Sequence, residues 1–191
     1  MELAVKEELD RVTDCGFFNA HLTRTQKEFL NLRHKKYESM ALPNIFSPEI
    51  ANAVIGRIQQ LTPQTQPQWG KMNVAQMLAH CNVAYEMTFE NIHPKPGIFM
   101  RWMLKALVKS GVTNEVPYKK NVRTAPAFLI TDERDFNKEK TRLIQYIEKC
   151  VSLGAAHFDG KESHSFGNMN STEWNNMFYK HLNHHLGQFG V

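Results

Sequence analysis

The sequence predicts an all-α fold: a four-helix bundle with one long crossover connection and a helical extension at its N-terminus. Apolar residues recur at helical spacing and nowhere alternate convincingly, as they would in a strand. Capping residues precede several of these apolar stripes, and prolines exclude a long helix from the longest connection. The chain of 191 residues is long enough for one domain, expected over residues 40–191, with the extension over residues 1–39.

The N-terminal extension differs from the remainder in composition. Residues 1–39 hold seven basic and seven acidic residues, and Val5, Leu9 and Val12 repeat at helical spacing. The character of the sequence then changes at Met40, where a compact domain can begin. We therefore expect the extension to be helical and leave its role open.

The first two helices of the bundle have clear start signals. Ser47 is a favoured N-cap residue, and Pro48 suits the first helical position because no N–H partner is needed there. We expect Pro63 to stop this first helix. Asn73 and Gln76 have the spacing of a capping box that opens the second helix. The apolar faces expected are Ile50, Val54, Ile58 and Leu61 on the first helix, and Met77, Leu78, Cys81, Ala84, Tyr85 and Phe89 on the second.

A short apolar helix and the long connection follow. The helix is expected over residues 98–109. Pro117 and Pro126 lie in the stretch 111–131 and forbid a long helix there. We therefore expect this stretch to be extended.

The last two helices are predicted from their ends. Asp132 is expected to cap a long helix that stops at Gly154. Residues 155–170 are rich in Gly, His and Asn and are expected to form a loop. Ser171 then opens a final helix that runs to about Gly187.

Composition and cysteine usage indicate a soluble, cytoplasmic protein with no membrane partner. No apolar run approaches the roughly 20 residues that a membrane span needs. The N-terminus is mixed in charge and lacks the apolar core of a secretion signal. The three cysteines, Cys15, Cys81 and Cys150, form no CxxC pair, so we expect free thiols in a reducing compartment.

Positive charge is concentrated in the middle of the chain. Residues 95–123 hold seven basic residues and one acid, an excess larger than the net charge of +4 of the whole chain. This segment is either a solvated surface or the mouth of a site that attracts an anionic small molecule. Nucleic acid is not an expected partner, because the chain has no recognised DNA-binding motif and its pI of 8.9 is only mildly basic. The candidates for steering an anion are Lys105, Lys109, Lys119, Lys120 and Arg123.

Three histidines have the placement of metal ligands. His181 and His185 lie four residues apart on the last helix, so both side chains share one face and can reach a single ion. His80 lies on the inward stripe of the second helix and is the best third candidate. Three imidazoles leave a coordination position open, as catalytic sites do. The alternative is that these histidines are satisfied in the core or at the surface without a metal.

Four other residues are candidates for positions around this cluster. His184 is turned away from His181 on the last helix, and we expect an outer or exposed position for it. Gln188 either hydrogen-bonds a ligand imidazole or is a surface amide. Tyr85 and Trp174 are either core aromatics or residues that line a substrate pocket.

Two segments contain these histidines in a recognisable pattern. The segments Met72–His80 and Tyr179–Phe189 resemble the DinB/YfiT-like superfamily and, within it, the family called domain of unknown function 1569. The resemblance covers about residues 42–191 and leaves 1–39 unmatched. Shorter motifs that also look like this family are Leu42-Pro43, Ser47-Pro48, Leu61-Thr62-Pro63, Trp69-Gly70, Phe166-Gly167 and Glu173-Trp174.

The resemblance implies a four-helix bundle in which three histidines hold a divalent metal ion. The matching residues here are His80, His181 and His185. Zinc, nickel and iron all accept imidazole ligands, so the sequence does not choose among them. Some members of the superfamily are metal-dependent transferases that act with low-molecular-weight thiols. Leu186 stands where the related pattern often has Arg, so we expect no anion contact from that position.

Two kinds of function follow from these observations. The first is a metal-dependent enzyme, a thiol-dependent transferase or a hydrolase, that acts on a small-molecule substrate. The second is a non-catalytic helical binding module with structural or vestigial histidines. No protein nucleophile or general base is evident beside the three histidines, and assembly as a homodimer is left open.

Overall fold

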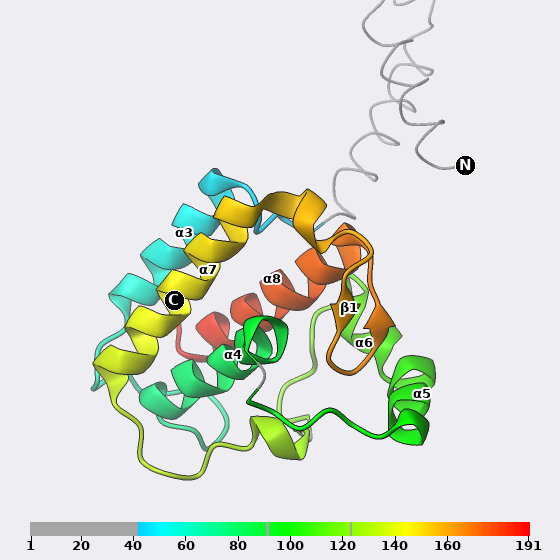
Figure 1. The fold of residues 1–191 in the computed structure, drawn as a ribbon. Coiled ribbons are helices and arrows are strands. Elements are labelled where there is room, and N and C mark those ends of the chain that lie inside the picture. Colours follow the sequence, from blue (N-terminus) through cyan, green and yellow to red (C-terminus); the bar gives the residue numbers. More distant parts are fainter. Residues whose placement is uncertain (1–41, 91, 123) are drawn as a thin grey trace, which may run out of the picture. The chain divides into compact units, whose positions relative to one another are not determined.

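Helices form most of the structure. The computed structural model describes residues 42–90, 92–122 and 124–191 (Figure 1). These residues form helices and one two-stranded hairpin, which agrees with the predicted helical class. The extension predicted over 1–39 lies outside the described residues.

The first two described helices begin where their caps predict. α3 (Pro48–Gln60) follows Ser47, whose hydroxyl accepts a hydrogen bond from a backbone N–H of the first turn. α4 (Val74–Phe89) follows Asn73, and the side chains of Asn73 and Gln76 form the reciprocal capping box. These bonds satisfy backbone donors that a helix start otherwise leaves without partners.

α7 (Phe136–Phe158) begins later than predicted. Asp135 rather than Asp132 is its N-cap, and the Asp135 carboxylate accepts a hydrogen bond from the backbone N–H of Lys138 at 2.9 Å. Asp132 instead forms an ion pair with Arg134 at 3.0 Å. Sequence spacing alone does not distinguish these two aspartates, because both are good capping residues.

The end of α7 is also more structured than expected. Gly154 interrupts the helix with a φ of 71°, but one more turn follows and buries Phe158 completely. The remaining stretch, expected to be a loop over 155–170, contains β1 (Glu162–Ser163) paired antiparallel with β2 (Gly167–Asn168). Two-residue strands are too short to show alternation in the sequence.

Three short helical segments lie between α4 and α7 in the described residues. α5 (Ile98–Leu107) accounts for most of the apolar helix predicted over 98–109. α6 (Lys109–Thr113) follows a bend at Val108 and occupies the start of the stretch expected to be extended. η2 (Pro126–Phe128) is a single 3-10 turn, in keeping with the limit that proline sets on helix length.

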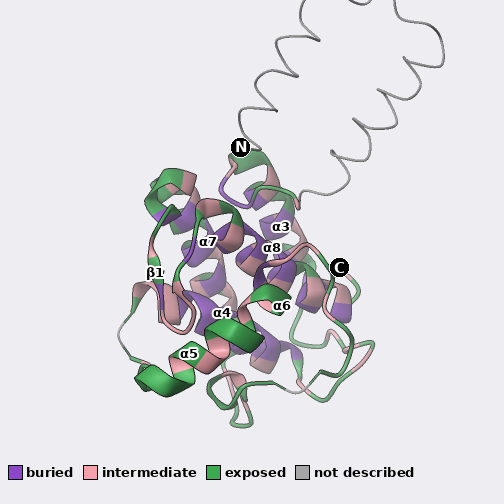
Figure 2. Cartoon of the chain, turned by 90° about the vertical axis from the view of Figure 1, so that its right-hand side faces the viewer, coloured by how far each residue is buried: buried purple, intermediate pink, exposed green. Residues whose placement is uncertain are grey.

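The core lies between the four longest described helices, which pack against one another (Figure 1). The last of them, α8 (Ser171–Gln188), begins with a capping box from Asn170 and Glu173. α4 is buried on nearly all sides because α7, α8 and η2 all contact it. In Figure 2 the buried residues, coloured purple, lie along these helices in the interior of the domain. The largest side chains that fill this core include Trp174, Tyr85, Phe158 and Phe178.

The structure bears on the expectations about membrane-spanning segments and about the cysteines. None of the helices within the described ranges is long and apolar enough to cross a membrane. Cys81 and Cys150 are free and buried, as expected, and burial raises the pKa of both thiols. Cys15 lies outside the described residues.

Removing residues 1–39 should leave the remaining chain folded. The described residues of the apolar core lie between Ile45 and Phe189. The truncated protein therefore keeps all of them. Circular dichroism and a thermal melt of residues 40–191 should show a helical protein with one cooperative transition. Loss of that transition would show that the extension contributes to the core.

Candidate metal centre

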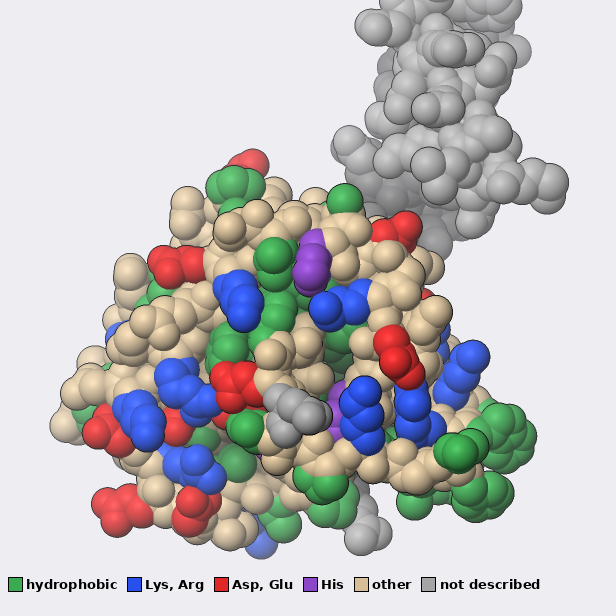
Figure 3. All heavy atoms as spheres, viewed as in Figure 1, with side chains coloured by type: hydrophobic (Ala, Val, Ile, Leu, Met, Phe, Trp, Pro, Cys, Tyr) green, Lys and Arg blue, Asp and Glu red, His purple; other side chains and the backbone are tan. Residues whose placement is uncertain are grey.

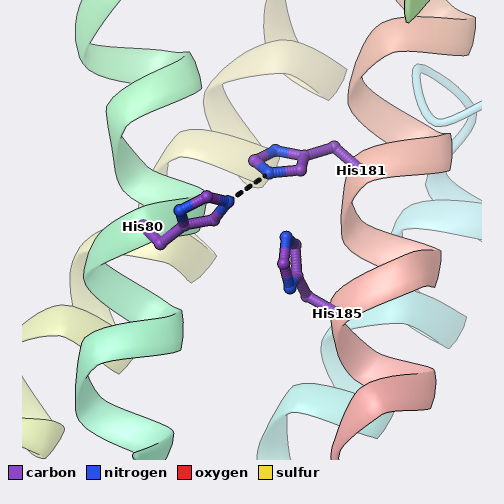
Figure 4. A group of neighbouring side chains, drawn as sticks. All are labelled: His80, His181 and His185. Atoms are coloured by element: carbon purple, nitrogen blue, oxygen red, sulfur yellow. Dashed lines mark hydrogen bonds between the residues drawn. The ribbon is translucent and has the colours of Figure 1, made fainter. Parts of the chain in front are cut away.

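Three histidine side chains converge between α4 and α8 (Figure 4). His80 comes from α4, and His181 and His185 come from α8, four residues apart. One nitrogen of each ring lies within 4.8 Å of a nitrogen of both other rings. His80 and His185 are buried, and His181 is half-buried. The packing of α4 on α8 thus brings together the three residues that helical spacing and the family resemblance singled out.

Two neighbouring acceptors orient two of these rings. Nδ1 of His80 lies 2.8 Å from the carbonyl oxygen of Phe128, and Nδ1 of His185 lies 2.8 Å from Oε1 of Gln188. Because a carbonyl oxygen only accepts, each Nδ1 carries the proton and each Nε2 keeps its lone pair. Partners of this kind orient metal-binding imidazoles. The Nε2 atoms of His80 and His185 are therefore available as ligands.

A short contact joins the two helices inside the cluster. Nε2 of His80 and Nε2 of His181 face each other at 2.9 Å, the dashed line in Figure 4. Since Nε2 of His80 has a lone pair, a hydrogen bond forms here only when Nε2 of His181 carries a proton. A divalent cation would accept lone pairs from both rings instead. The arrangement can therefore hold either a proton or a metal ion between the rings.

Burial keeps the three imidazoles neutral. It lowers the pKa of His80, and it lowers the pKa of His181 well below the ordinary value, with the neighbouring histidines adding to the effect. It lowers the pKa of His185 to about 3. Protonation, which would block metal binding, is therefore disfavoured at neutral pH.

The loop before α4 holds Gln188 in place. The side-chain amide of Gln188 donates to the carbonyl oxygen of Trp69 at 2.7 Å, and its backbone carbonyl accepts from the N–H of Gln68 at 2.7 Å. Gly70 has a φ of 86°, and a Cβ added there would lie 2.5 Å from Nε2 of Gln188. Only glycine fits both the conformation and the space. The loop thus fixes Gln188 and, through it, the ring of His185.

Sequence reasoning missed two parts of this arrangement. Phe128 acts through its backbone carbonyl, for which a sequence carries no signal. The sequence marks Gly70 only through its family-like pair with Trp69, because its closeness to Gln188 is a tertiary contact.

Comparison with known proteins assigns the chain to a family. The family model described as a protein of unknown function, DUF1569, matches residues 47–190. The chain belongs to this family. A search of curated proteins and a search of solved structures each gave no significant match.

The other candidate residues of this DUF1569 protein occupy two different places. His184 lies beside the cluster, with its ring centroid 5.0 Å from that of His185 and 6.0 Å from that of Trp69. Tyr85 and Trp174 are each 1% exposed and pack within the aromatic core. His184 and Gln188 are therefore close to the histidine cluster, whereas Tyr85 and Trp174 fill the interior.

The basic residues expected to steer an anion also differ in their surroundings. Nζ of Lys109 lies 2.7 Å from the Glu173 carboxylate, so its charge is already paired. Nζ of Lys120 lies 4.0 Å from the ring centroid of Trp69, which places this charge near His184. Arg123 lies outside the described residues. Lys105, Lys119 and Lys120 are exposed.

Replacing Gly70 by Ala should weaken metal binding without unfolding the protein. The new Cβ would displace the Gln188 amide and release the ring of His185. Loss of such a supporting hydrogen bond typically costs about 10–100-fold in metal affinity. The affinity for zinc, measured by competition with a chelator, should fall for Gly70→Ala and for Gln188→Ala. Gly56→Ala is the control, because a Cβ at Gly56 meets nothing within 4 Å. Unchanged affinity in both site variants would remove Gln188 from the site.

The metal-free protein should lose stability as the pH falls below about 6.5. The buried histidines have a lower pKa when folded than when unfolded, so the unfolded state binds more protons below that pH. Each histidine should contribute on the order of 1 kcal/mol per pH unit to the decline. Denaturant unfolding between pH 7 and 5, with a chelator present, measures this slope. It should become shallower in His185→Leu and stay the same in His157→Ala, which changes an exposed histidine.

Proposed function

We propose that this DUF1569 protein is a divalent-metal protein of the DinB/YfiT-like type, with a four-helix bundle fold and a metal centre formed by His80, His181 and His185. The observation that carries the proposal is the orientation of the rings. The bonds to Phe128 and Gln188 leave the Nε2 lone pairs of two buried, neutral imidazoles available, within 4.8 Å of a nitrogen of the third ring. Zinc, nickel and iron all suit three imidazole ligands.

We propose an enzymatic role for this centre: a metal-dependent transferase that uses a low-molecular-weight thiol, or a hydrolase. A bound divalent ion would act as a Lewis acid that lowers the pKa of a thiol or a water molecule. In the described residues no carboxylate is hydrogen-bonded to the three imidazoles, so none is placed there as a general base. A thiol fits better than water for this reason, because its own pKa is closer to neutral.

The second candidate function is a non-catalytic binding module. The distance of 2.9 Å between Nε2 of His80 and Nε2 of His181 supports it, because that is an ordinary hydrogen-bond length. In this alternative a shared proton, and no metal, joins α4 to α8. Metal analysis separates the two functions.

Replacing His80, His181 or His185 by Ala should each reduce the bound metal sharply. Each removes one of three ligands, and two imidazoles form a much weaker site. Elemental analysis of the purified protein after reconstitution with zinc, nickel or iron(II) measures the stoichiometry, and circular dichroism checks the fold. His184→Ala should retain most of the metal. Wild-type protein that binds no metal, or ligand variants that bind as well as the wild type, would support the non-catalytic alternative.

The catalytic part of the proposal has its own test. Metal-loaded wild-type protein should transfer or consume a small thiol in a screen of electrophilic substrates, and the His181→Ala protein should not. Metal binding without any such activity would leave the metal centre in place and reject the thiol-dependent transferase.

A further inference from the structure

α5 presents a large apolar surface to solvent. Ile98, Phe99, Trp102 and Leu107 are 90%, 75%, 66% and 76% exposed, and we call these four residues the α5 surface. No residue of α5 is buried. Figure 3 shows hydrophobic side chains projecting at the lower right, where Figure 1 places α5. Contiguous exposed apolar side chains of this size mark interaction sites.

Ion pairs attach the polar side of this segment to the rest of the domain. Arg101 on α5 contacts the Glu162 carboxylate of the β1–β2 hairpin at 2.5 Å. Lys109, at the start of α6, contacts Glu173 of α8 at 2.7 Å. These ion pairs connect α5 to the β1–β2 hairpin and α6 to α8.

Positive charge flanks the α5 surface and no negative charge lies within it. α5 contains no acidic residue, and the sequence holds none between Lys95 and Asn114. Lys95 and Lys105 are both exposed. Lys105 lies three residues after Trp102, so the two side chains are neighbours on the helix surface. The α5 surface is therefore apolar at its centre and basic at its edge.

We propose that the α5 surface docks on an anionic lipid bilayer. Interfacial helices place Trp, Phe and Leu among the lipid headgroups and acyl chains and keep Lys and Arg at the anionic surface. The rings of Phe99 and Trp102 stack with their centroids 6.3 Å apart and form one projecting apolar unit. Each exposed Lys near such a surface adds about 1 kcal/mol of attraction.

A second copy of this chain is a poorer occupant. A two-fold contact between α5 helices would bring the same residues together from both copies. α5 itself carries Arg101 and Lys105 but no acid, and Glu162 is already paired with Arg101, so the opposing α5 would offer Lys105 no acidic partner. An anionic bilayer complements this charge, and its fluid interface adapts to projecting side chains without a matching groove.

This proposal revises the expectation that the protein has no membrane partner. That expectation rested on the lack of an apolar run long enough to span a bilayer. An interfacial helix needs no such run, because it lies in the plane of the interface.

Co-sedimentation of the full chain with lipid vesicles tests the proposal. Binding to vesicles of phosphatidylcholine with phosphatidylserine should exceed binding to phosphatidylcholine alone, and it should weaken as salt rises. The double variant Phe99→Asp, Trp102→Asp should lower the partition coefficient at least about tenfold. Lys105→Glu should lower binding to the anionic vesicles only. The matched control is Leu129→Asp, which changes a residue outside α5 with the same exposed fraction as Trp102, 66%.

Three results would overturn the proposal. One is a full chain that does not bind anionic vesicles, and another is a double variant that binds them as well as the wild type does. The third is a wild-type dimer, seen by light scattering, that the double variant converts to a monomer while vesicle binding is absent. That outcome would assign the α5 surface to a second copy of the chain.

Discussion

The packing of α4 against α8 is the constraint on which the candidate site depends. α4 is buried on nearly all sides, so its polar residue His80 loses water when the domain folds. A buried polar group without partners would cost several kcal/mol. The structure offsets this cost with the carbonyl of Phe128 on one ring nitrogen and His181 on the other. The packing of α4 in the core therefore also sets the geometry of the histidine cluster.

A second set of contacts extends this arrangement to the surface. Gln188 joins His185 to the loop that precedes α4, and Gly70 provides the space for its amide. The same loop carries Trp69, which lies beside His184 and under Lys120. An anionic substrate that approached the cluster from this side would meet an aromatic ring and a positive charge. Gln188 thus orients His185, and Trp69 and Lys120 lie beside His184 at the edge of the histidine cluster.

Much of this could be predicted from the sequence, because it rests on local chemistry. Caps such as Ser47 and Asn73 mark helix starts through bonds within one turn, and a spacing of four residues places His181 and His185 on one face. The N-cap of α7 could not be placed from the sequence, because Asp132 and Asp135 are both good capping residues. The hydrogen bond from His80 to the Phe128 carbonyl could not be predicted, because it joins residues far apart in the sequence. The exposure of Trp102 could not be predicted either, because it depends on which other segments pack against α5.

X-ray absorption spectroscopy of the metal-loaded full chain is the sharpest test of the three-histidine metal centre, because it reports the atoms bound to the ion. For zinc, we expect three imidazole nitrogens at about 2.0–2.1 Å, with the remaining positions occupied by light atoms from solvent or buffer. The signal of one imidazole should disappear in His80→Ala. A spectrum with sulfur ligands, or with fewer than three imidazoles in the wild-type protein, would contradict the proposed centre.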